Sequence, residues 1–84
     1  MDKKLVRAVF GEVLRESRES RNLTQAELGT ALNMDRAYIS MLECGRKMPT
    51  LEMILRLALA LRRSPGEIVG EVARRLKTNP EGLV

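Results

Sequence analysis

Apolar residues recur at helical spacing in five successive stretches of the chain, and no stretch shows the strict alternation of a strand. The first predicted helix runs from about residue 3 to 21, with Asp2 as its N-cap. Its apolar stripe consists of Leu5, Val6, Val9, Phe10, Val13 and Leu14. Asn22 is expected to end this helix, and Leu23 to pack back onto the core. The pattern therefore predicts an all-α fold.

Two short helices joined by a tight turn are predicted between residues 24 and 45. The first opens with Thr24-Gln-Ala-Glu27, a capping-box pattern, and the second begins after Asp35 and ends at Gly45. Asn33 is expected to adopt the left-handed conformation between them, because Asn tolerates positive φ. The apolar residues that would hold the pair together are Leu28, Leu32, Met34, Ile39 and Leu42. This spacing predicts a helix-turn-helix.

The outer face of the second of these helices carries the candidate binding residues Arg36, Ala37, Ser40 and Met41. In a helix-turn-helix this face is offered to the DNA major groove. A guanidinium such as that of Arg36 favours guanine O6 and N7, and Ala37 can touch a thymine methyl group. For Met41 two interpretations stay open: it reads a thymine methyl, or it fills space beside Leu42. Tyr38 either donates to a phosphate, which we favour, or braces the helix.

A fourth and a fifth helix follow. Pro49 disfavours helix just before it and Thr50 can cap the fourth helix. The buried stripe expected on this helix is Leu51, Ile54, Leu55, Ala58 and Leu61. The fifth helix, about 64–77, opens with Ser64-Pro-Gly-Glu67, which supplies a Ser cap, Pro at N1 and Glu at N3. We expect one domain over residues 1–77 and a flexible tail over 78–84.

Composition narrows the function classes. The 84 residues include 15 Lys+Arg against 11 Asp+Glu, a net charge of +4 that favours polyanionic partners only modestly. The absence of His and the single Cys44 argue against a Cys/His zinc site, a Ser-His-Asp triad and an internal disulfide. The longest apolar run, Leu57 to Leu61, is too short to span a bilayer. We therefore expect a cytoplasmic protein that is not an enzyme and has no metal, cofactor or membrane partner.

Residues 5–63 resemble the helix-turn-helix domain of the phage repressor and Cro superfamily, also called XRE-like. The resemblance rests on an ordered set of motifs: Arg18, then Leu23-Thr-Gln-Ala-Glu-Leu28, Ile39-Ser-Met-Leu-Glu43, Gly45-Arg-Lys-Met-Pro49 and Ala58-Leu-Ala-Leu61. It implies a five-helix lambda-repressor-like fold with the helix-turn-helix at helices 2 and 3. It also implies a transcriptional regulator that binds double-stranded DNA. The short length and the Arg36-Ala-Tyr-Ile-Ser40 segment are most similar to restriction–modification controller proteins, with stand-alone Cro-like regulators and antitoxins as alternatives.

The resemblance also assigns roles to individual positions. The residues that match base-reading positions are Arg36, Ala37, Ser40 and Met41. The residues that match phosphate-binding positions are Thr24, Gln25, Tyr38, Arg46 and Lys47. Arg18 and Glu43 match a structural ion pair that ties the first helix to the third. An alternative function, as an antitoxin or coactivator that binds a protein partner, would use the same fold with little DNA contact.

The fifth helix raises the question of oligomeric state. This part of the chain offers more apolar surface than a small monomer usually exposes. The residues that contribute are Leu57, Ile68, Val69, Val72 and Leu76. Either this helix folds over the first and fourth helices and buries Val6 and Val9, or it forms a homodimer interface, and both can hold. A two-fold dimer would place its two recognition helices about 34 Å apart, which suits a palindromic operator.

Overall fold

Five α-helices make up most of residues 1–77, the part of the chain that this computed structural model describes. They are α1 (Lys3–Glu19), α2 (Gln25–Ala31), α3 (Arg36–Glu43), α4 (Leu51–Ala60) and α5 (Pro65–Lys77). The all-α, five-helix prediction is confirmed over these residues. The flexible tail predicted for 78–84 lies outside the described residues.

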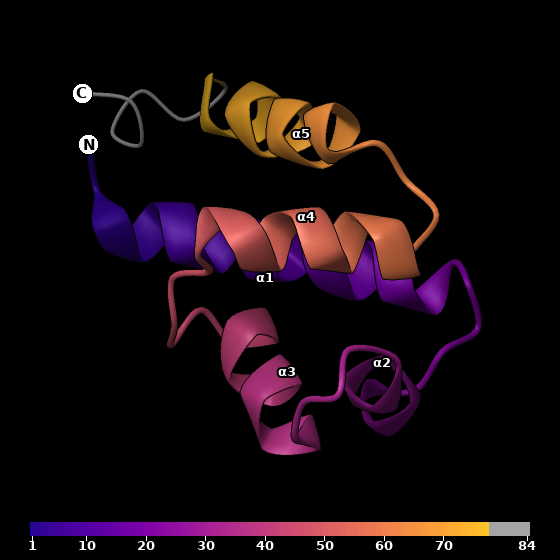
Figure 1. The fold of residues 1–84 in the computed structure, drawn as a ribbon. Helices are drawn as coiled ribbons and strands as arrows, with labels where there is room; N and C mark the ends of the chain where they lie inside the picture. Colours follow the sequence, from indigo (N-terminus) through magenta and orange to yellow (C-terminus); the bar gives the residue numbers. More distant parts are fainter. Residues whose placement is uncertain (78–84) are drawn as a thin grey trace.

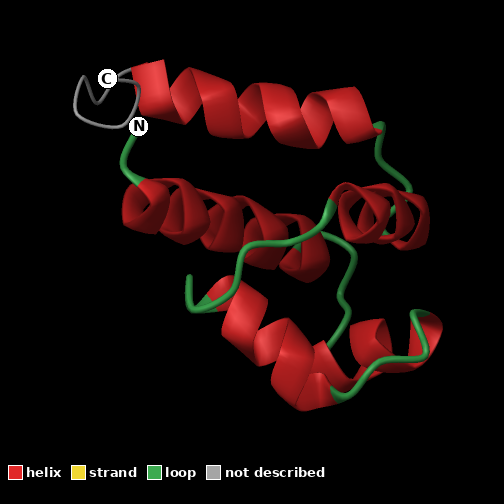
Figure 2. Ribbon diagram, turned by 60° about the vertical axis from the view of Figure 1, so that its left-hand side comes forward, coloured by secondary structure: helices red, strands yellow, loops and turns green. Residues whose placement is uncertain are grey.

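The helices are arranged at three levels (Figure 1). α1 and α4 form the middle level, α5 lies on one side of both, and α2 and α3 lie on the other side, as the rotated view also shows (Figure 2). α1 contacts both α3 and α5, and α2 packs closely on α3. The helix-turn-helix is therefore supported by α1 and does not depend on α5 for its position.

The predicted helix caps are present. The Asp2 carboxylate accepts from the backbone of the first turn of α1, and the capping box of Thr24 and Glu27 forms in both directions. Asn33 has φ 56° and Gly45 has φ 73°, so the turn before α3 and the stop after it both use left-handed residues. α1 ends at Glu19, slightly earlier than expected.

The core lies between the three levels. Its most deeply buried side chains are Val13, Leu14, Leu28, Ile39, Leu42, Leu57 and Leu61. Gly11 lies where α1 crosses the C-terminal end of α3, and a Cβ added there would collide with the Leu42 and Glu43 carbonyl groups. α1 and α3 can approach this closely only because Gly11 has no side chain.

The buried stripe predicted for α4 is wrong at two positions. Leu51 and Leu55 face solvent with 71% and 49% of their surface exposed, whereas Met53 and Leu57 are buried. Because α4 is apolar on most sides, its sequence pattern does not define which side turns inward. The neighbouring helices decide that.

Three residues of the expected dimer interface are corrected in the same way. Leu57, Ile68 and Leu76 keep only 1–4% of their surface exposed and lie in the core of a single chain, so no second chain can contact them. Val72 is partly buried against the same core, and Val69 is exposed. α5 folds over α1 and α4, as the first interpretation predicts, and Val9 is buried, but Val6 stays half-buried.

Within residues 1–77, no helix is both long and apolar enough to cross a membrane.

Candidate nucleic-acid interface

α3 presents one polar face to solvent because its opposite face is locked into the core. Ile39 and Leu42 have no exposed surface. Successive helical residues differ by about 100°, so the four predicted base-reading residues fall on the side away from these two. The base-reading set is Arg36, Ala37, Ser40 and Met41, of which the first two are exposed and the last two half-buried. All four side chains thus lie where a ligand outside the domain could reach them.

The N-terminus of α3 is fixed by its cap. The Asp35 carboxylate accepts from the backbone N–H of Ala37 at 3.3 Å, and Asp35 itself has extended backbone angles. Arg36, one residue further, makes no hydrogen bond or ion pair within the described part of the chain. Its guanidinium therefore remains available for bidentate hydrogen bonding.

A buried ion pair ties α1 to the end of α3. The Arg18 Nε and Nη2 atoms donate to the Glu43 carboxylate at 2.6 and 3.0 Å, and Arg18 Nη1 donates to the Leu23 carbonyl at 2.7 Å. The hydrogen bonds that Arg18 donates to Glu43 raise the pKa of Arg18 above its usual value. The predicted pairing of these two residues is present, and it also anchors the loop before α2.

Gln25 joins this pair, a contact for which the sequence gives no signal. Its Nε2 donates to Glu43 Oε1 at 3.0 Å, so the Glu43 carboxylate accepts from both Arg18 and Gln25. An amide nitrogen carries two hydrogens, so one N–H of Gln25 remains for another acceptor. The residue predicted to bind phosphate is therefore held in place by the ion pair that was expected to be purely structural.

The other predicted phosphate ligands flank α3. Thr24 Oγ1 accepts from the Glu27 N–H at 3.0 Å, which leaves its hydroxyl proton to donate elsewhere. Arg46 and Lys47 are exposed in the loop after α3, and Lys47 Nζ lies 5.6 Å from the centre of the Tyr38 ring. Tyr38 is half-buried, with its side chain packed against the core.

The loop after α3 is anchored on α1 by a residue that the sequence did not single out. Arg7 Nε donates to the Gly45 carbonyl at 3.2 Å. A Cβ at Gly45 would lie only 3.1 Å from the Ala8 backbone. These contacts fix the start of the basic loop relative to α3.

Several other arginines are used inside the fold. Arg21 donates to the Leu61 and Arg62 carbonyls at the end of α4, and Arg56 donates to the Leu32 carbonyl at the end of α2. These side chains satisfy carbonyl groups that a helix end leaves without partners. Much of the positive charge of the chain therefore holds helices together, and only a subset surrounds α3.

Comparison with known proteins identifies the family of this chain. Residues 14–68 match the helix-turn-helix family, a range that includes α2, α3 and all of α4.

Two relatives and one solved structure extend the comparison. The ImmF control region 10 kDa protein of Bacillus phage phi105 is 33% identical over 52 residues, which cover 62% of this chain and 58% of that protein. The transcriptional regulator ClgR of Mycobacterium tuberculosis is 39% identical over 57 residues, covering 68% of this chain and 51% of ClgR. The chain thus spans little more than half the length of these two relatives.

The solved structure is that of the restriction-modification controller protein C.AhdI from Aeromonas hydrophila. It superposes with a TM-score of 0.70 at 38% identity and covers 73% of this chain and 92% of that structure. This likeness supports the expected lambda-repressor-like arrangement of the helices.

Proposed function

Because the chain belongs to the helix-turn-helix family, of the XRE-like type, we propose that it is a transcriptional regulator that binds double-stranded DNA sequence-specifically as a homodimer. The observation that carries the proposal is the polar outer face of α3, which lies opposite the buried Ile39 and Leu42 and begins at Arg36, a residue with no ion-pair partner among residues 1–77. A rigid helix with such a face is the element that helix-turn-helix proteins insert into the major groove.

In the proposed complex, α3 reads bases. Arg36 donates two parallel hydrogen bonds to a guanine, and Ala37 packs against a thymine methyl group. Ser40 and Met41, one turn further along α3, face the next base pairs. Because Met41 has no hydrogen-bonding N–H or O–H group, its contact is apolar.

The surrounding residues position α3 by binding phosphates. Gln25, Thr24 and Tyr38 each have a donor group left over after their internal contacts, and Arg46 and Lys47 add positive charge at the other end of α3. Such contacts fix the register of the protein on DNA without reading sequence. The Arg18–Glu43 pair contributes indirectly, by holding Gln25.

The homodimer and its palindromic operator are part of the same proposal. Uncovered leucines on α4 give the chain an apolar surface that a small monomer rarely retains. A two-fold dimer presents two copies of α3, so it binds two inverted half-sites whose centres lie about 34 Å apart.

Selection of bound duplexes from a random pool tests this function directly. We expect an enriched palindrome with half-sites one helical turn apart, and binding that weakens steeply as salt increases. Enrichment of no sequence, together with specific capture of a protein partner, would instead favour the antitoxin or coactivator alternative.

A further inference from the structure

The basic loop, residues 45–49, joins α3 to α4 and carries two exposed basic side chains, Arg46 and Lys47. Its first residue lies against the backbone of α1, because a Cβ at Gly45 would stand only 3.1 Å from a Cα atom of that helix. Arg7 Nε donates to the Gly45 carbonyl at 3.2 Å. A backbone carbonyl that is turned away from water needs a donor. Arg7 supplies it for the peptide group that directly precedes Arg46.

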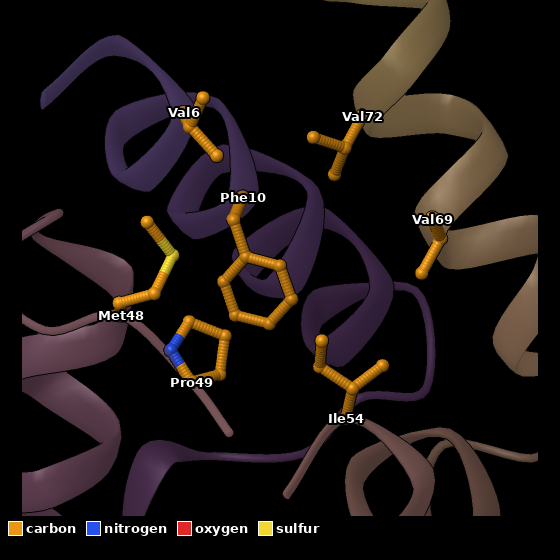
Figure 3. Close-up of a pocket in the computed structure, with 7 residues that line it drawn as sticks. All are labelled: Val6, Phe10, Met48, Pro49, Ile54, Val69 and Val72. Carbon is orange, nitrogen blue, oxygen red and sulfur yellow. The ribbon is translucent and has the colours of Figure 1, made fainter. Parts of the chain in front are cut away.

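The end of the basic loop is held in an apolar groove on the same helix. The groove has a volume of about 160 Å³, and Val6 and Phe10 of α1 line it together with Met48 and Pro49 of the loop. Figure 3 shows Met48 and Pro49 on the same side of the Phe10 ring. Pro49 is buried, and its own ring fixes the backbone angle φ there. The basic loop is therefore attached to α1 by a hydrogen bond at its start and by apolar contacts at its end.

Between these two attachments the basic side chains are held close to α3. The Arg46 N–H donates to the Met41 carbonyl at 2.9 Å, and Lys47 Nζ lies 5.6 Å from the centre of the Tyr38 ring. A shift of the Gly45 peptide group would therefore move Arg46 and Lys47 together relative to α3. Phosphate contacts fix the register of a protein on DNA, so this relative position matters for binding.

The contact between Arg7 and Gly45 does not require the charge of Arg7. A neutral amide N–H can also donate to a carbonyl. Arg7 could therefore act in two separable ways, by holding the basic loop through Nε or by binding a phosphate through its charge. Arg46 and Lys47 are exposed, whereas Arg7 is half-buried with Nε directed at a carbonyl. This difference favours the first role.

We propose that Arg7 is a positioning residue for DNA binding: by holding the Gly45 carbonyl, it sets where Arg46 and Lys47 meet the phosphates of the DNA backbone. Arg7 itself does not touch DNA. This inference rests on the proposed function and adds to it a residue outside the helix-turn-helix. Arg7 also lies outside residues 14–68, the range that matches the family.

Two substitutions at position 7 separate the hydrogen bond from the charge. In Arg7→Gln, the amide nitrogen Nε2 stands as many bonds from Cα as Nε does in arginine, so it can still donate to the Gly45 carbonyl. Arg7→Met has a side chain of the same length and a similar helix propensity, but no donor. Both substitutions remove the charge. Arg15→Met is the control for the loss of one positive charge from α1, because Arg15 is exposed.

Fluorescence anisotropy on the selected operator and on random duplexes gives the main result. Arg7→Gln and Arg15→Met should bind within about twofold of wild type, whereas Arg7→Met should bind both kinds of duplex at least about fivefold more weakly, since phosphate contacts do not read sequence. Equal losses in Arg7→Gln and Arg7→Met, with a salt slope reduced by about one in both, would mean that Arg7 binds phosphate directly and that the proposal is wrong. Wild-type affinity in Arg7→Met would also overturn it.

A double-mutant cycle distinguishes positioning from a general loss of stability. If Arg7 acts through the basic loop, Lys47→Ala should cost less affinity in the Arg7→Met background than in wild type, because Lys47 is already displaced there. The measurement is made at a temperature where circular dichroism shows every variant folded. Additive losses would contradict the proposal.

Nuclear magnetic resonance without DNA tests the attachment of the loop separately from the function. The Arg46 N–H belongs to the same peptide group as the Gly45 carbonyl, so its chemical shifts report the hydrogen bond from Arg7. They should move in Arg7→Met and stay near wild type in Arg7→Gln, and equal shifts in the two variants would overturn the inference. Failure of wild type to bind any duplex would remove the proposed function and the positioning role with it. Wild-type binding without a loss in Arg7→Met would remove the positioning role alone.

Discussion

At the scale of single residues, Glu43 connects stability and recognition. Its carboxylate, 3% exposed, accepts from both Arg18 and Gln25, so one acceptor joins the core ion pair to a predicted phosphate ligand. The resemblance to the phage repressor and Cro superfamily implied only a structural role for Glu43. The structure adds an indirect role, because the orientation of the Gln25 amide depends on it.

Removal of this carboxylate should be costly. We expect Glu43→Ala to lower the free energy of unfolding by about 3–5 kcal/mol, because it leaves the Arg18 guanidinium buried without its anion. The total free energy of unfolding of a typical domain is only about 5–15 kcal/mol. Urea denaturation measures the loss, with Glu19→Ala, an exposed carboxylate of α1, as the control. A loss no larger than that of the control would contradict the importance of the pair.

Base and phosphate contacts should respond differently to mutation. Arg36→Ala is expected to cost about 1–3 kcal/mol on the selected operator and to relax specificity at one base pair per half-site. Lys47→Ala should weaken binding to all sequences similarly and reduce the salt slope by about one. Fluorescence anisotropy on operator and random duplexes measures both, with Arg15→Ala on α1 as the control. An unchanged ratio of specific to random binding in Arg36→Ala would exclude Arg36 as a base reader.

At the scale of helices, two glycines have opposite roles although both lie in helix interiors. A Cβ at Gly11 would collide with the α3 carbonyls, whereas a Cβ at Gly70 would point into open space. Gly70→Ala should therefore stabilise the protein by about 0.5–1 kcal/mol through helix propensity, and Gly11→Ala should destabilise it. Thermal unfolding of the two variants gives the comparison. Stabilisation by both would mean that α1 and α3 are less tightly packed than described.

The contact of α5 with α1 should weaken in acid. Arg75 donates to Glu16 at 2.6 Å, and this hydrogen bond lowers the pKa of the Glu16 carboxyl from its ordinary value of 4.5. A carboxyl whose pKa is lowered on folding stabilises the protein above its unfolded pKa and loses that contribution as the pH falls through the folded pKa.

Glu16→Gln tests this linkage. The variant should be less stable than wild type at pH 7 by under about 1 kcal/mol, since Glu16 is more than half exposed. The difference should shrink as the pH falls below 4.5. Urea unfolding across this pH range measures the difference in the free energy of unfolding. Glu19→Gln is the control. Glu27→Gln is not suitable, because Glu27 caps α2. A difference that grows in acid would have the wrong sign.

At the scale of the whole molecule, folding and association should be linked. If two chains associate in the proposed homodimer, the folded state gains stability as protein concentration rises. The Tm of wild type should therefore increase with concentration. Leu59→Glu, which places a charge among the exposed leucines of α4, should weaken this dependence if these leucines are covered in the dimer. Scanning calorimetry over a hundredfold range of concentration checks this. A wild-type Tm independent of concentration would contradict the homodimer.

The local features of this protein were determined by its sequence. Helix caps, the capping box at Thr24 and the left-handed turns at Asn33 and Gly45 depend on a few neighbouring residues, so a sequence pattern predicts them correctly. The polar outer face of α3 was also predictable, because α3 has only one apolar side. Its role in reading DNA stays a prediction.

Only the tertiary structure decided which side of α4 is buried and which charges are used internally. An almost uniformly apolar helix can turn any face inward, and the positions of α1 and α5 selected Met53 and Leu57 over Leu51 and Leu55. Likewise, Arg7 and Arg21 look like solvated charges in the sequence, yet each donates to a carbonyl about 40 residues away. Burial and long-range hydrogen bonds depend on what lies opposite in space, and this information is spread over the whole chain.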